Sequence, residues 1–242
     1  TGIGGISTNY WISFFLRLVY CCKGYVLRGK SMNTILITLI AISAILYLIF
    51  AIYYENKIYK FIWKPGTMIL IIILAITGSG LSTTFSYWVL LALVFSLMGD
   101  IILMLREKWF IYGLVSFLIA HILYIVGFIV SFSFTFSLNI FLLIIALIIL
   151  AVILYFYLYQ NVRKEGGKKL LFAVALYIII ITTMVSLAIM TGIKILIAAA
   201  FLFFISDAIL AVNKFKVKFR LADYFVMSTY FTSQLLFVIS IL

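Results

Sequence analysis

The stretch FSLNIFLLIIALIILAVILYFYL, residues 136–158, decides the fold. None of its twenty-three side chains is charged. As a helix it extends about 35 Å, enough to cross the ~30 Å hydrocarbon layer of a bilayer. Hydrophobic residues make up 67% of the 242-residue chain and charged residues 10%, more apolar than a soluble domain allows. The sequence therefore predicts an all-α, polytopic integral membrane protein.

About eight such apolar runs follow Met32, and together they predict one transmembrane domain over residues 32–242. Pro65, the only proline, is expected at the first helical residue of its span, where its missing N–H costs nothing. The predicted spans are Thr34–Tyr53, Pro65–Leu81, Thr84–Leu105, Phe110–Val130, Phe136–Leu158, Lys169–Met190, Ile193–Val212 and Ala222–Leu242.

The first thirty-one residues do not fit this pattern. The tract Thr1–Ser31 carries four basic residues, and Arg17 interrupts its one apolar stretch. That stretch is too short and too charged for a convincing span. We interpret Met32 as the natural start and residues 1–31 as an N-terminal extension outside the fold. The alternative is a cleavable signal peptide, although no small-residue cleavage site follows the apolar stretch.

Basic residues are distributed unevenly between the loops. Only Lys194 lies in a loop on one side, and thirteen lie in the loops on the other: Lys57, Lys60, Lys64, Arg106, Lys108, Arg163, Lys164, Lys168, Lys169, Lys214, Lys216, Lys218 and Arg220. This asymmetry predicts that the basic loops are cytoplasmic in a cell membrane. It also accounts for the net charge of +12, since no nucleic-acid-binding motif accompanies the charge.

Two aspartates and the one histidine fall well inside predicted spans, away from their ends. A charged side chain at membrane depth costs at least ~2.5 kcal/mol, so Asp100 and Asp207 are candidates for function. His121, the only histidine, lies near the middle of its span, where a packing role is the alternative. Counted at 1.5 Å per residue, the three share a layer in the cytoplasmic half. They are the predicted catalytic residues, and no metal or organic cofactor is expected, because zinc needs three or four such ligands.

The predicted site is a polar cavity that opens toward the cytoplasm and binds a lipid with one hydrocarbon chain. Lys64 and Lys214 are expected to contact its phosphate, so that removing either charge raises the Michaelis constant more than it lowers turnover. Asp223, at a helix start, is expected only to complement the helix dipole. The remaining predicted substrate-binding residues are Tyr124, Tyr177, Asn213, Tyr230 and Gln234.

Several motifs occur in order along residues 32–242 and resemble the YhhN-like lysoplasmalogenase family. The resemblance implies an eight-helix membrane hydrolase that cleaves the vinyl ether bond of lysoplasmalogen into a fatty aldehyde and a glycerophospho-base. The motifs are Lys64-Pro65-x-Thr67-Met68, Phe95-Ser96-Leu97-x-Gly99-Asp100, Gly113-x3-Phe117-x3-His121-x2-Tyr124, Ser206-Asp207-x2-Leu210-Ala211-x-Asn213-x-Phe215 and Tyr230-x3-Gln234.

Acid and base catalysis by two carboxylates suits this chemistry. The sequence does not assign the two roles, and we favour Asp207 as the proton donor and Asp100 as the ionised partner. The similar strings around the two aspartates also predict two parallel four-helix repeats. A small transporter or channel that binds a cation or proton at the aspartates is an alternative, as is a lipid-binding scaffold. The expected partners are the lysophospholipid substrate and the bilayer, and the sequence leaves the oligomeric state open.

Overall fold

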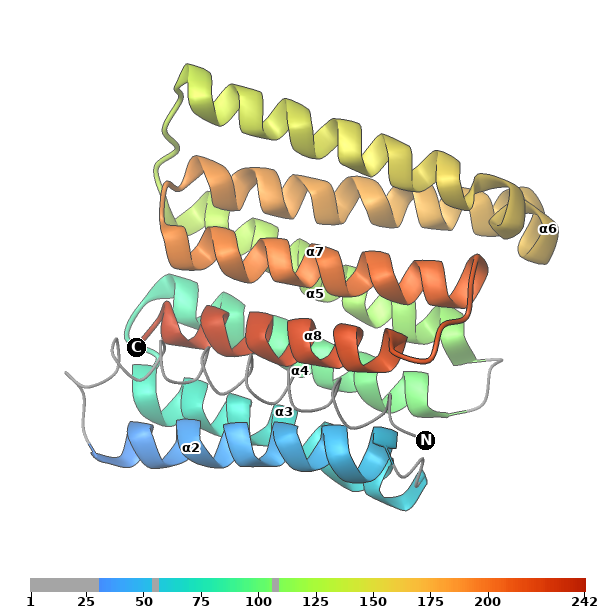
Figure 1. Ribbon diagram of the computed structural model, residues 1–242. Coiled ribbons are helices and arrows are strands. Elements are labelled where there is room, and N and C mark those ends of the chain that lie inside the picture. Colours follow the sequence, from blue (N-terminus) through green and yellow to red (C-terminus); the bar gives the residue numbers. More distant parts are fainter. Residues whose placement is uncertain (1–30, 54–56, 106–108) are drawn as a thin grey trace, which may run out of the picture.

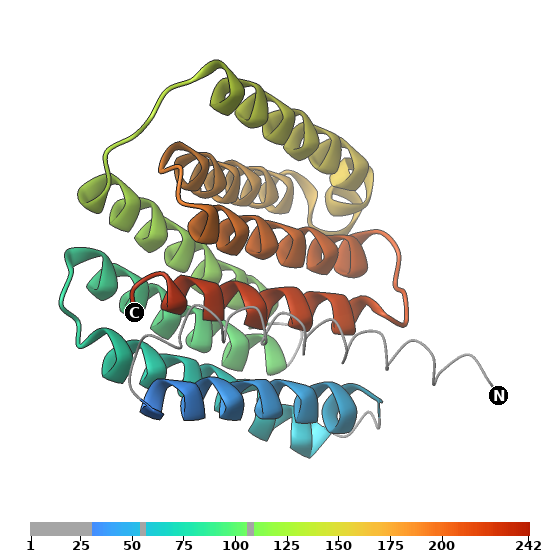
Figure 2. The ribbon, with the colours of Figure 1, turned by 60° about the vertical axis from the view of Figure 1, so that its left-hand side comes forward.

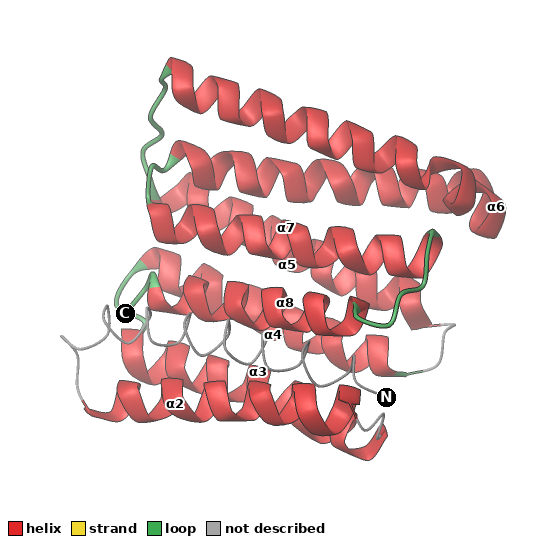
Figure 3. Cartoon of the chain, viewed as in Figure 1, coloured by secondary structure: helices red, strands yellow, loops and turns green. Residues whose placement is uncertain are grey.

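The computed structural model describes residues 31–53, 57–105 and 109–242, and this part of the chain contains helices and loops but no β-strand (Figure 1, Figure 3). The predicted all-α class is confirmed. Most of the predicted extension, residues 1–30, and the basic residues Arg106 and Lys108 lie outside the described residues. In chain order the elements are α2 (Ser31–Leu46), the π-helix η1 (Tyr47–Tyr53), α3 (Lys57–Ser79), α4 (Thr84–Met104), α5 (Phe110–Ser131), α6 (Leu138–Met190), α7 (Lys194–Phe215) and α8 (Ala222–Ile239).

Six of the described helices are long and apolar enough to cross a membrane. They are α2 with the start of η1, α3, α4, α5, α6 and α7. Many of their large apolar side chains point outward, as expected where lipid is the solvent. The protein is therefore a multi-pass integral membrane protein.

Helix α6 contains two antiparallel segments. Its 53 residues would extend about 80 Å if straight, far beyond a bilayer. Gly166 and Gly167 leave helical geometry, and Gly167 has a φ of 64°, a left-handed conformation that glycine adopts without strain. The chain reverses there, and residues 138–165 lie beside residues 168–190 (Figure 1, Figure 2). The segment predicted as a loop, residues 159–168, is thus largely helical.

The prediction that Pro65 begins its helix is wrong. Helix α3 begins at Lys57, so Pro65 lies inside it, two turns from the start. The apolar pattern of the sequence indicates only the part of α3 that lies in lipid. The basic residues before that part are also helical. A proline inside a helix removes one backbone hydrogen bond. Thr67, two residues later, donates its hydroxyl to the carbonyl of Trp63 at 2.8 Å within the same turn.

Nearly all residues of helix α8 are buried, and the helix packs against α7, α3, α4 and η1 (Figure 1). It carries several hydroxyl side chains and one amide, and most of these groups find partners inside the protein, although the Thr232 hydroxyl has none among the described residues. Ser233 donates to the carbonyl of Ala199 in α7 at 2.7 Å, and the Ser206 hydroxyl of α7 donates to the carbonyl of Val226 at 3.1 Å. Polar side chains are tolerated at membrane depth when neighbouring helices supply such partners. Helix α8 therefore contributes several of the polar side chains that are buried inside the bundle.

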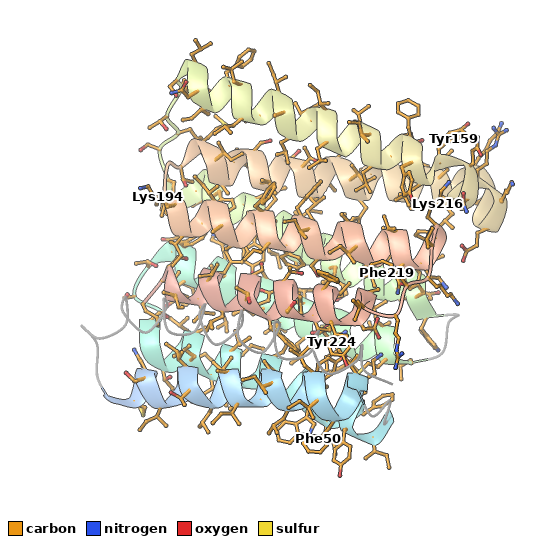
Figure 4. The ribbon with its side chains drawn as sticks, viewed as in Figure 1. Phe50, Tyr159, Lys194, Lys216, Phe219 and Tyr224 are labelled. Carbon is orange, nitrogen blue, oxygen red and sulfur yellow. The ribbon has the colours of Figure 1, made fainter. Side chains whose placement is uncertain are left out.

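The basic segments gather at one end of the bundle, which we call the basic end. Figure 4 shows Lys216 at this end, with Phe219 and Tyr224, and Lys194 at the opposite end. The Lys216 ammonium lies 3.3 Å from the side-chain oxygen of Asn161 and 5.0 Å from the centre of the Tyr157 ring. These contacts join the end of α7 to the part of α6 just before its turn at Gly166 and Gly167. The two aspartate-bearing helices, α4 and α7, both end here.

Candidate active site

Asp100 lies four residues before the end of α4 and is buried, with 1% of its surface exposed. The Lys64 ammonium from α3 lies 2.9 Å from Oδ1, and the Tyr230 hydroxyl from α8 donates to Oδ2 at 2.8 Å. Each oxygen thus receives a donor, one of them a cation. A carboxyl group that accepts hydrogen bonds at both oxygens is stabilised in its ionised form, because the neutral acid would have to donate at one of them.

Close packing of α4 against α5 supports this arrangement. A Cβ atom added at Gly99 would meet the Phe117 ring at 2.7 Å, so only glycine permits the observed approach without movement of that ring. The Phe117 ring packs edge-on against Tyr230, with their centres 5.8 Å apart. Gly99 therefore helps to fix the tyrosine that binds Asp100.

Asp207 in α7 has a different environment. The Tyr177 hydroxyl from α6 donates to Oδ2 at 2.5 Å, and Nε2 of His121 from α5 lies 3.6 Å from the same oxygen. Neither ring nitrogen of His121 has a hydrogen-bond partner within the part of the chain that the structure describes, and Phe203 packs on its ring at 4.5 Å. The contacts from Tyr177 and His121 both involve Oδ2, so within the described residues the other carboxyl oxygen, Oδ1, is available for a substrate.

Each aspartate has one partner from the helical segment before it and one from a distant helix. For Asp100 in α4 these are Lys64 of α3 and Tyr230 of α8. For Asp207 in α7 they are Tyr177 of α6 and His121 of α5. Residues 31–131 form four helical segments when η1 is counted with α2, and residues 138–239 form four more when the two parts of α6 are counted separately. In each half the aspartate lies in the third segment, its first partner lies in the second, and its other partner lies in the fourth segment of the opposite half.

Tyr124 and Gln234 form a separate buried network. The Tyr124 hydroxyl donates to the side-chain oxygen of Gln234 at 2.7 Å, and the amide nitrogen of Gln234 donates to Ser96 at 3.1 Å. All three side chains are fully buried, and the Tyr124 ring stacks on Phe237 at 4.0 Å. The network connects α4, α5 and α8 and includes neither aspartate. Its position suits a structural role better than direct contact with a substrate.

Two cavities meet at Asp207. A polar cavity of about 150 Å³ lies at the basic end and includes Asp100, Tyr230 and Lys64 in its wall. An apolar cavity of about 230 Å³ lies between α5, α6 and α7 and reaches Tyr177. Asp207, Phe110 and Leu210 line both. The combined space is polar at one end and apolar at the other, with Asp207 at the boundary.

Among the described residues, five predicted site residues do not line either cavity: His121, Tyr124, Gln234, Asn213 and Lys214. The Asn213 side chain accepts a hydrogen bond from the Phe219 amide at 3.2 Å, which closes the loop between α7 and α8. The Lys214 ammonium lies 3.8 Å from Glu165 and 5.1 Å from the centre of the Phe110 ring. Among the described residues, the lining of the two cavities includes neither Asn213 nor Lys214.

The polar cavity is also lined by three residues that the sequence did not predict to belong to the site. Tyr47, Lys60 and Asp223 line it, and Asp223 pairs with Lys60 at 3.4 Å in addition to its place in the first turn of α8. One sequence signal points to Lys60, which precedes Lys64 by four residues and so shares its helix face. Tyr47 is one of sixteen tyrosines and gives no such signal.

The fold and the site define a class: a multi-pass membrane protein whose buried carboxyl groups line a cavity that is part polar and part apolar. The chain belongs to the YhhN family, whose model matches residues 59–241. This family includes lysoplasmalogenases. The matched range contains both aspartates with their partners Lys64, His121, Tyr177 and Tyr230. No curated protein and no solved structure matches the chain.

Proposed function

We propose that this protein is a membrane-embedded hydrolase that cleaves the vinyl ether bond of a lysoplasmalogen to a fatty aldehyde and a glycerophospho-base. One observation carries the proposal: two buried aspartates in contrasting electrostatic environments line a single polar cavity, which meets an apolar cavity at Asp207. Family membership supports the same reaction.

The shape of the combined space suits an amphiphile with one hydrocarbon chain. The apolar cavity is lined by aliphatic and aromatic side chains from α5, α6 and α7, which favour a hydrocarbon chain. The polar cavity holds two lysines and three carboxyl groups, which favour a charged headgroup. A lysoplasmalogen spanning both would bring its vinyl ether bond, which joins chain to glycerol, close to Asp207.

The chemistry divides between the two aspartates. Asp207 is within reach of a hydroxyl and an imidazole but of no lysine or arginine among the described residues, so burial favours its neutral acid form. As the acid it donates a proton to the β-carbon of the vinyl ether, and the carbon–carbon π electrons form the new C–H bond. Positive charge then develops on the α-carbon and the ether oxygen. Asp100, held ionised by Lys64, stabilises that charge.

Water completes the reaction. It attacks the α-carbon, and its proton returns to the Asp207 carboxylate, which restores the acid. The hemiacetal hydroxyl then loses its proton and becomes the aldehyde carbonyl. The C–O bond to glycerol breaks with its electron pair going to the glycerol oxygen, and that oxygen takes up the proton as the aldehyde leaves. The sum is one water consumed and one ether bond cleaved. Tyr177 holds Asp207 in position by donating to Oδ2, and Tyr230 does the same for Asp100; His121 lies against Oδ2 of Asp207 without a hydrogen bond.

The topology of this enzyme completes the proposal. We count eight spans, with two from α6 and one from α8, and we assign the basic end to the cytoplasm. The equivalent partners of Asp100 and Asp207 support two parallel four-helix repeats that share one site. Superposing residues 31–131 on residues 138–239 is expected to bring the two aspartates together. A poor superposition would remove the repeat and leave the reaction unaffected.

The direct test is aldehyde release by the purified protein in detergent micelles or nanodiscs. Lysoplasmalogen is the substrate, and two analogues are the controls: the saturated ether, which cannot be protonated at a double bond, and the acyl ester. We expect fatty aldehyde and glycerophospho-base in equal amounts from the vinyl ether alone. Cation- or proton-dependent uptake into liposomes without aldehyde would favour the transporter alternative instead.

Chain length gives a second test, because Leu118 and Ile181 close the apolar cavity on the side away from the basic end. Leu118→Trp is expected to shorten the cavity and leave several methylene groups of a long chain unburied. At ~0.8 kcal/mol for each buried methylene, kcat/KM for a sixteen-carbon substrate should fall about tenfold or more. An eight-carbon substrate should be little affected. Ile122→Trp, one turn further along α5 and exposed, is the matched control. Equal losses for both chain lengths would contradict this location of the chain.

A further inference from the structure

The outer part of the polar cavity contains three groups that the proposed reaction does not use. They are the hydroxyl of Tyr47 and the ion pair between Lys60 and Asp223. Each comes from a different element, η1, α3 and α8 respectively. All three lie at the basic end, where a headgroup must enter if the chain occupies the apolar cavity.

Tyr47 lines this cavity and has a buried hydroxyl. The side chain is fully buried, and its oxygen has no hydrogen-bond partner within residues 31–53, 57–105 and 109–242. The ring is fixed edge-on against Phe231, with ring centres 5.7 Å apart. The residue also begins a π-helical segment, a distortion often found at functional sites. A buried hydroxyl without a protein partner is costly unless something else binds it.

The pair Lys60–Asp223 is open to exchange. Its ammonium and carboxylate are 3.4 Å apart, and the two side chains are 39% and 46% exposed. Exposed ion pairs contribute little to stability, so an anion that binds Lys60 can displace Asp223 easily. Lys64 is the other lysine in the cavity, and its ammonium already binds Asp100 at 2.9 Å. Lys60 is therefore the lysine best suited to an incoming anion.

We propose that Tyr47, Lys60 and Asp223 form a headgroup subsite for a zwitterionic phosphodiester. Lys60 and the Tyr47 hydroxyl bind the phosphate oxygens, and Asp223, released from Lys60, binds the ammonium group of the base. Three donors and acceptors from three elements match the alternating charges of such a headgroup. The subsite rests on the proposed function, since it assumes that the substrate is a lysophospholipid.

The test compares three vinyl ether substrates with the same chain: one with phosphoethanolamine, one with a phosphomonoester and no base, and one with neither. Lys60→Gln and Tyr47→Phe are expected to raise KM about tenfold for the two phosphate-bearing substrates, with turnover and the phosphate-free substrate unchanged. Asp223→Asn should raise KM only for the substrate that carries the amine. Lys214→Gln, a lysine at the same end outside the cavity lining, is the control and should leave every KM unchanged.

Binding is measured separately, so that the subsite and the reaction can fail independently. Lysophosphatidylethanolamine, an ester analogue, and monoacylglycerol are titrated into the full-length protein in nanodiscs. Lys60→Gln should weaken binding of the first about tenfold and leave the second unchanged, even if no substrate is hydrolysed. Unchanged affinity and unchanged KM in all three variants would overturn the subsite while leaving the hydrolase intact. Equal competition by inorganic phosphate would assign the site to the free anion and overturn the lipid headgroup.

Discussion

Asp207→Asn is expected to lower the turnover of vinyl ether hydrolysis at least a hundredfold, about the contribution of one general acid. An asparagine amide keeps the size of the side chain and can still accept the Tyr177 hydroxyl, but it cannot give a proton to carbon. Asp100→Asn should cause a loss of similar size, because a neutral amide cannot stabilise the developing positive charge. Initial rates of aldehyde release under substrate saturation measure both effects.

The control for these variants is Glu165→Gln, which removes an exposed carboxylate that pairs with Lys214 outside both cavities. Its turnover should equal that of the natural protein. Retention of the unfolding midpoint and of the elution volume in size-exclusion chromatography establishes that the aspartate variants remain folded. Normal turnover in either folded aspartate variant would contradict the mechanism with two carboxyl groups.

The sequence predicts that both aspartates belong to the site and share one depth in the membrane, and there is a physical reason for this. The cost of a charge in lipid makes an acidic residue inside an apolar run conspicuous, and helix geometry converts residue counts into depth. Asp100 and Asp207 indeed line one cavity. The same argument cannot show which residues pair with each aspartate, because the partners lie on other helices. Tyr230, for example, is 130 positions from Asp100.

Flanking residues are the hardest to interpret from sequence. Lys64 precedes the apolar run of α3 and looks like an ordinary basic flank, but it is 7% exposed and binds Asp100. Asp223 lies 163 positions from Lys60, and no local pattern indicates that pair. The turn in α6 depends on Gly167 alone for its left-handed backbone, within a segment that is otherwise helical on both sides. Contacts between helices decide the first two cases, and spacing along one helix does not report them.

Lys64→Met is the second variant with a large expected effect. The sequence alone assigns Lys64 to the substrate phosphate and predicts an increase in KM, whereas its 2.9 Å contact with a carboxylate that is 1% exposed predicts a loss of stability and turnover. Removing one member of a buried ion pair leaves an uncompensated charge and costs about 3–5 kcal/mol. Asp100 would relieve that cost by taking up a proton, and the ionised carboxylate needed for charge stabilisation would be lost.

The double variant Lys64→Met with Asp100→Asn separates the two roles of Lys64. If the ammonium serves mainly to balance Asp100, neutralising both partners should restore most of the unfolding midpoint lost in Lys64→Met, while turnover stays as low as in Asp100→Asn. If the ammonium instead binds phosphate, the single variant should keep its stability and turnover and show only a raised KM. Thermal unfolding and steady-state kinetics on the four proteins of this cycle measure the coupling between Lys64 and Asp100 directly. Because the two side chains come from α3 and α4, a strong coupling would show that packing between these helices controls the charge of the active-site carboxylate.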